Sequence, residues 1–185
     1  MFMATKSARW TRKDLERFPE DGNRYEVLDG ELLVTPQAAP DHQVVAGRLG
    51  AALWNYCEST LAGLSVRPGA VVWGDNELQP DIEVLPRNAY RRGIKWVELP
   101  HPLLVVEVLS PFGVSANRDF EVKRKAYLKR GIDEYWVVDH EKRRVHVWSG
   151  GRPGKIVTDV LRWSPDPTVT PFELALDRLF GPAGD

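Results

Sequence analysis

The chain has 185 residues, with 25 lysines and arginines against 26 aspartates and glutamates. A chain of this length buries enough apolar surface to fold as a single domain, here expected over residues 1–185, without disulfides to hold it together. The near-neutral charge excludes the global basic field that marks many nucleic-acid-binding proteins.

Cysteine content and hydropathy indicate the expected compartment. Cys57 is the single cysteine, which excludes an intramolecular disulfide and favours a reducing cytoplasm. The first ten residues, MFMATKSARW, lack the apolar core of a signal peptide, and no run reaches the roughly 18 apolar residues of a membrane span. We therefore expect a soluble cytoplasmic protein with no membrane partner.

The N-terminal segment predicts a short helix followed by a β-hairpin. Residues 11–18, TRKDLERF, are typical of a helix with Thr11 as its N-cap and Asp14 at its third position. Residues 25–34, YEVLDGELLV, place the favoured turn pair Asp29-Gly30 between two extended arms. This pattern predicts an N-terminal hairpin.

A long helix and three strands are expected next. Residues 40–57 carry apolar side chains at helical spacing, with Asp41 as the predicted N-cap. Strands are then predicted within residues 64–73, 80–85 and 102–110. The third of these strands is apolar on both faces, which indicates a central position in a sheet that is covered on both sides.

The C-terminal half alternates helix and strand. Residues 115–131 predict a helix that ends at Gly131, and residues 134–140 and 143–149 predict a strand pair. After a proline-rich passage, residues 172–180 predict an amphipathic tail helix. The order of elements indicates an α/β fold of the mixed α+β kind, with a central mixed β-sheet flanked by helices.

Glu107 is out of place in the apolar strand PLLVVEVLS at 102–110. A lone buried carboxylate costs several kcal/mol unless it is compensated. Pro80 marks the beginning of the preceding strand, with Asp81 directly after it. If the two strands are antiparallel, the start of one meets the end of the other. Asp81 and Glu107 are then expected to converge.

The helix after Glu107 offers the missing positive charge. Asp119, Lys123 and Tyr127 follow one another at steps of four, so they share one helix face. Lys123 can then reach back toward Glu107. Two carboxylates and a backbone carbonyl are hard oxygen ligands suited to Mg²⁺, or Mn²⁺ in its place, and this combination is typical of phosphodiester hydrolysis.

Taken in order, these motifs resemble a known group of nucleases. PD at 80 and 81, EVL at 107 to 109, D...K...Y at 119, 123 and 127, and GIDEYWVVD at 131 to 139 are similar to motifs of the PD-(D/E)XK superfamily, and more narrowly of its Uma-type branch. The resemblance covers about residues 24 to 148. It implies a restriction-endonuclease-like core and a Mg²⁺-dependent endonuclease acting on DNA, with Asp81 and Glu107 as metal ligands and Asp81, Glu107 and Lys123 as the catalytic residues.

The sequence departs from the superfamily pattern at one position. The lysine of the (D/E)XK motif would stand at 109, which is Leu109 here. The resemblance to the Uma-type branch implies that Lys123 on the following helix replaces it. In that branch Glu26 or Glu31 of the hairpin substitutes for an acidic residue of the first helix, and we predict Glu26 as a third carboxylate on the metal side.

Four further residues are candidates for supporting the site. His42 is expected to cap or position rather than bind metal, and Ser110 to form hydrogen bonds beside the site. Asp119 is predicted to position Lys123 through a contact one helical turn away. For Tyr127, a place in the core is favoured over a functional role.

Three alternatives stay open. Glu107 and Lys123 could form a structural buried ion pair. The same fold could be a catalytically silent module that binds nucleic acid or a protein, which the near-neutral charge favours. A metal-free hydrolase of sugars with two carboxylates is a third alternative, disfavoured because it gives Lys123 no role. A homodimer would suit cutting of both DNA strands.

Overall fold

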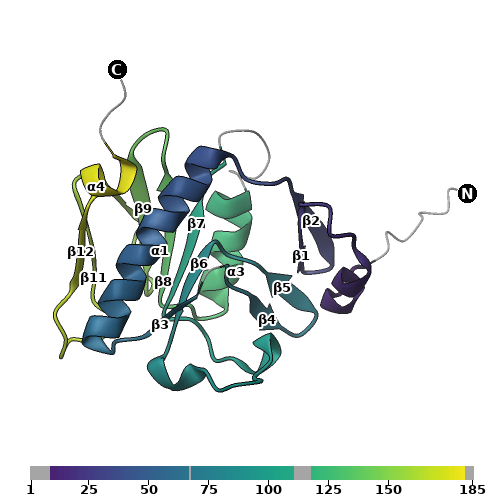
Figure 1. Cartoon of the computed structure of the whole chain (residues 1–185). Coiled ribbons are helices and arrows are strands. Elements are labelled where there is room, and N and C mark those ends of the chain that lie inside the picture. Colours follow the sequence, from purple (N-terminus) through teal and green to yellow (C-terminus); the bar gives the residue numbers. More distant parts are fainter. Residues whose placement is uncertain (1–8, 67, 111–117, 182–185) are drawn as a thin grey trace, which may run out of the picture.

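A six-stranded mixed sheet forms the centre of the computed structural model, which describes residues 9–66, 68–110 and 118–181. The strand order is β10-β9-β8-β7-β6-β3, and every neighbouring pair is antiparallel except β7 and β8. The strands are β3 (Leu64–Val66), β6 (Ile82–Leu85), β7 (Leu104–Val108), β8 (Glu134–Asp139), β9 (Arg144–Ser149) and β10 (Lys155–Val157). This sheet, with helices against it, confirms the predicted fold class (Figure 1).

The long helix α1 (Pro40–Thr60) covers one face of this sheet (Figure 1). Its buried residues, among them Leu49 and Leu53, pack with Val106 of β7 and Trp136 of β8 in one apolar cluster. Asp41 was predicted as the N-cap, and this is wrong, because Ala39 is the N-cap and Pro40 opens the helix. Proline suits that first position because its fixed φ is already helical and its missing N–H needs no partner there.

The opposite face is covered by a helix described from residue 118 onward. A π-helical turn, η4 (Arg118–Lys123), continues into α3 (Arg124–Lys129). Gly131 then has a φ of +86°, the left-handed conformation expected where this helix ends. Tyr127 packs into a second apolar cluster with Val105 and Val137. The central strands are therefore buried on both sides, as predicted for residues 102–110.

A smaller sheet of order β2-β1-β5-β4, which includes β4 (Val71–Trp73) and β5 (Asn76–Leu78), lies beside the helix α3 (Figure 1). The hairpin of β1 (Arg24–Leu28) and β2 (Glu31–Thr35) was predicted, and its turn residues Asp29 and Gly30 have φ of 51° and 89°. The preceding helix is also confirmed, as the 3₁₀ turn η1 (Arg12–Arg17). Two further short 3₁₀ turns are η2 (Arg87–Ala89) and η3 (Trp96–Glu98).

The strand predicted over residues 64–73 is in fact two strands in different sheets. Its first part is β3, and its last part is β4 (Val71–Trp73), which pairs with β5 (Asn76–Leu78). Pro68 cannot donate to a ladder, and the N–H of Gly69 donates to the carbonyl of Pro80 at 2.9 Å, which turns the chain away.

The predicted tail helix is half strand. β11 (Val160–Trp163) pairs with β12 (Phe172–Ala175), and only α4 (Leu176–Phe180) is helical. The apolar spacing of this segment suits a helix as well as a strand, and pairing with β11 decides for the strand. None of the helices in the described ranges is long and apolar enough to cross a membrane.

Candidate active site

The antiparallel pairing of β6 and β7 brings Asp81 and Glu107 together. Ile82 pairs with Val106, so the register, continued by one residue, sets Asp81 opposite Glu107. Both carboxylates are buried, with relative exposures of 8% and 2%. The predicted convergence of the two acids is present in the structure.

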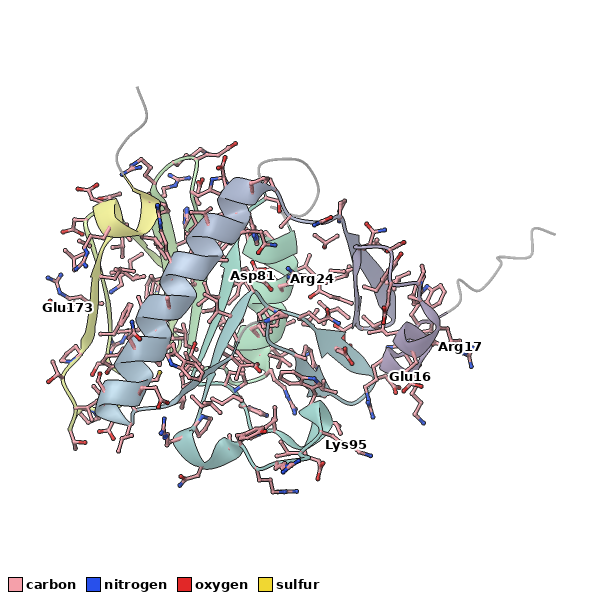
Figure 2. The ribbon with its side chains drawn as sticks, in the orientation of Figure 1. Glu16, Arg17, Arg24, Asp81, Lys95 and Glu173 are labelled. Atoms are coloured by element: carbon pink, nitrogen blue, oxygen red, sulfur yellow. The ribbon has the colours of Figure 1, made fainter. Side chains whose placement is uncertain are left out.

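Asp81 is held by three donors from three elements. Its Oδ2 accepts from the backbone N–H of Val108 at 2.8 Å and lies 3.1 Å from Nε2 of His42. Its Oδ1 accepts from Arg24 of β1 at 2.7 Å, and Figure 2 shows these two side chains next to each other. Burial alone would raise the pKa of Asp81, but His42, Arg24 and Val108 together hold it well below the usual range. Asp81 is therefore ionised at neutral pH.

Lys123 compensates Glu107 from the helical side. Its Nζ lies 3.1 Å from Oε1 of Glu107 and 2.9 Å from Oε2 of Glu26, and its side chain is 4% exposed. The hydroxyl of Tyr127 donates to the same Oε1 of Glu107 at 3.4 Å. The face shared by Lys123 and Tyr127 thus points at Glu107, and Tyr127 is both a core residue and a partner of this carboxylate.

Glu26 lies beside the lysine. It is fully buried on β1, and its Oε1 accepts from the N–H of Gln79 at 2.7 Å while Oε2 faces Lys123. Glu31, the alternative from the hairpin, is exposed. Glu26 is therefore a second counter-ion of Lys123, and its place as a third carboxylate on the metal side stays a prediction.

A cation position between Asp81 and Glu107 is defined by Arg24. Its guanidinium contacts Asp81 and also lies 3.9 Å from Oε2 of Glu107. Leaving His42 aside, three carboxylates face two basic side chains, which leaves one negative charge in excess. Within the described residues, no three His, Cys, Asp or Glu side chains cluster as a complete metal site. Mg²⁺ usually takes only one or two protein carboxylates and keeps several waters, so the pair Asp81 and Glu107 fits such an ion.

A small cavity of about 20 Å³, roughly the space of one water, opens onto these groups. Its lining includes Ser110, predicted as a neighbour of the site, and Thr35 of β2. The side chain of Asp119 lies outside the described residues, so its contact with Lys123 stays a prediction. Leu109 packs in the second apolar cluster, which agrees with the absence of a lysine at that position.

A much larger hollow lies elsewhere, between α1 and β12. It measures about 870 Å³ and is lined by side chains such as Tyr56 and Phe172. We place the site at the small cavity because the buried charges converge there and Asp81 has a shifted pKa.

Arg24 is the site residue that sequence reasoning missed. The spacing of Arg24 and Glu26 could have indicated its place, because residues two apart in a strand share one face. With Glu26 in the site, Arg24 could have been placed beside it.

Comparison with protein-family models identifies the family of this chain. The family model Uma2, described as "Putative restriction endonuclease", matches residues 12–177. The chain belongs to the Uma2 family. This confirms the resemblance drawn from the motifs at 80–81, 107–109 and 119–127.

A solved structure shows the same fold. The Uma2 chain matches the crystal structure of a putative nuclease belonging to DUF820 from Anabaena variabilis with a TM-score of 0.75 and 19% identity. The match covers 92% of this chain and 97% of the other. A search of curated proteins finds no match.

Proposed function

We propose that this Uma2 protein is a Mg²⁺-dependent nuclease that hydrolyses phosphodiester bonds of DNA. The family description and the name of the similar structure both refer to nucleases. The observation that carries the proposal is the meeting of Asp81, Glu107 and Lys123 at one small cavity. Two acids and an amine around a cation position are the groups that phosphodiester hydrolysis needs.

Asp81 and Glu107 would hold the metal, and Mn²⁺ could replace Mg²⁺. When bound, the ion supplies a Lewis acid that stabilises negative charge on phosphoryl oxygens. His42 and the N–H of Val108 fix the orientation of Asp81, so this carboxylate needs no rearrangement to act as a ligand.

Lys123 provides positive charge next to the reacting phosphate. Glu26 and Glu107 hold its Nζ from two sides, which fixes the amine at the cavity. From there it would orient the attacking water and stabilise the charge that develops in the transition state. The role of Glu26 is to position Lys123.

The test is cleavage of plasmid and single-stranded DNA with Mg²⁺ or Mn²⁺, with EDTA to remove the metal. Asp81→Asn and Glu107→Gln should each abolish cleavage while circular dichroism shows a folded protein. Glu83→Gln is the matched control, because it changes a buried carboxyl two residues after Asp81 that does not line the cavity. Undiminished cleavage by both site variants would assign the activity to a contaminant.

A silent binding module is the second candidate, and Arg24 is the observation that favours it. Its guanidinium lies within ion-pair distance of both Asp81 and Glu107, so the two acids have a shared counter-ion without metal. Calorimetry that shows equal DNA binding with Mg²⁺ and with EDTA, together with no cleavage, would select this candidate.

A further inference from the structure

Arg24 lies at the open edge of the candidate site. Its side chain is 24% exposed, whereas those of Asp81 and Glu107 are 6% and 2% exposed. It lines the cavity, and it also donates to the carbonyl of Gln79 at 2.6 Å. Of these three charged groups, Arg24 is therefore the one that can move outward without crossing the core.

A guanidinium and a divalent ion would compete for the same carboxylate oxygens. Arg24 contacts Oδ1 of Asp81 at 2.7 Å, and the other Asp81 oxygen is already taken by Val108 and His42. The guanidinium lies within ion-pair distance of both acids through Oδ1 of Asp81 and Oε2 of Glu107, so a metal held by these two carboxylates would compete with Arg24 for Oδ1. Arg24 must then leave that oxygen.

We propose that Arg24 is a displaceable counter-cation: it holds Asp81 and Glu107 together in the metal-free site, is displaced by the divalent ion, and then binds a phosphate of the substrate. This inference rests on the proposed function. It adds a role in metal affinity and substrate binding for a residue outside the motifs at 80–81, 107–109 and 119–127.

The net charge of the site supports the proposed binding of a substrate phosphate by Arg24. Without metal the three carboxylates outweigh Arg24 and Lys123 by one negative charge, which disfavours a phosphate. With a divalent ion bound, the net charge of the site becomes +1, which matches the single negative charge of a phosphodiester. A guanidinium binds phosphate through two parallel N–H groups, and its place at the cavity edge is where a substrate would arrive.

The first test is calorimetric titration of the whole protein with Mn²⁺. Removing the competing charge in Arg24→Gln should tighten Mn²⁺ binding about ten-fold, the lower end of the range for close charge pairs. Arg24→Lys keeps the charge and should bind Mn²⁺ within about two-fold of wild type, and it serves if the glutamine variant does not fold. Arg162→Gln is the control, because it breaks an exposed pair with Glu173 at the far side of the molecule (Figure 2).

The possible results separate the inference from the proposed function. Equal or weaker Mn²⁺ binding by Arg24→Gln, with wild-type binding lost in Asp81→Asn, overturns the inference and leaves the nuclease proposal standing. No Mn²⁺ binding by either wild type or Arg24→Gln overturns both. Mn²⁺ binding that appears only in Arg24→Gln overturns both, because Arg24 of the wild type then keeps the cation position and is not displaced.

The second test measures binding of a fluorescent single-stranded oligodeoxynucleotide by anisotropy, with Ca²⁺ in place of Mn²⁺ to limit cleavage. Arg24→Gln and Arg24→Lys should each bind the oligodeoxynucleotide about ten-fold more weakly than wild type, since both lose the bidentate hydrogen bonds of a guanidinium to phosphate. In EDTA the difference between wild type and variants should vanish, because Arg24 is then bound to Asp81. Equal affinities with Ca²⁺ would refute the phosphate-binding role.

Discussion

Glu83 is a residue at which we expect the stability of the protein to depend on pH near neutrality. It lies on β6, is 1% exposed, and its side chain lies next to Gly69. Within the described residues neither of its carboxyl oxygens has a hydrogen-bond partner of good geometry. Burial raises its pKa from 4.5 to about 7, although the nearby N–H of Ala70 offsets part of this shift.

The shift sets both the size and the direction of the effect. Below about pH 4.5 the carboxyl is protonated in both the folded and the unfolded chain, and it costs nothing. Between this pH and about 7 the unfolded chain releases the proton while the folded chain keeps it, so the free energy of unfolding falls as pH rises. Above about pH 7 the full cost of roughly 3 kcal/mol is reached.

Glu83→Gln removes this titration and keeps the shape of the side chain. Urea unfolding followed by tryptophan fluorescence should show the variant about 3 kcal/mol more stable than wild type at about pH 8.5, and within about 1 kcal/mol of it at about pH 5. Other titrating groups cancel in this difference. The same difference at both pH values would refute the argument, because it would show that the carboxyl of Glu83 does not change its ionisation between them.

Three further outcomes are expected. Lys123→Met should lower the free energy of unfolding by about 3–5 kcal/mol, because it removes the ammonium that Glu26 and Glu107 share, and adding Glu26→Gln should restore part of this loss in urea titrations. His42→Ala should weaken Mn²⁺ binding about ten-fold in calorimetry, with Asp81 less well oriented. Cys57, buried and with a pKa raised to about 11 by burial, should react with a thiol reagent at pH 8 only as fast as the protein unfolds.

The sequence was sufficient for the part of the site that depends on local periodicity. Pro80 at a strand start and Glu107 near a strand end were enough to predict that Asp81 and Glu107 meet once the strands are antiparallel. A step of four on a helix was enough to put Lys123 and Tyr127 on one face. Each of these predictions uses residues within one element or in two elements adjacent in the sheet.

The sequence was not sufficient where two sheets pack against each other. The hairpin of β1 and β2 could be predicted from its turn, but no local pattern says which side chains of β1 face Lys123 and Asp81. Arg24 was for this reason not predicted in the site, and Glu26 was predicted there but not as a partner of Lys123. The error at 172–175 has another origin, since the apolar spacing there fits a helix as well as a strand and pairing with β11 decides for the strand.

The turn of the β1–β2 hairpin determines which charged side chains of β1 face the site. Arg24 and Glu26 are two residues apart and therefore lie on the same face of β1. This one strand supplies the cation beside Asp81 and the anion beside Lys123. A slip of one residue in a strand register turns every side chain to the other face. The Asp29-Gly30 turn fixes the register between β1 and β2, and a slip would remove both charges from the site at once. Residues far from the motifs at 80–81 and 107–109 thereby set the charge balance on which metal binding depends.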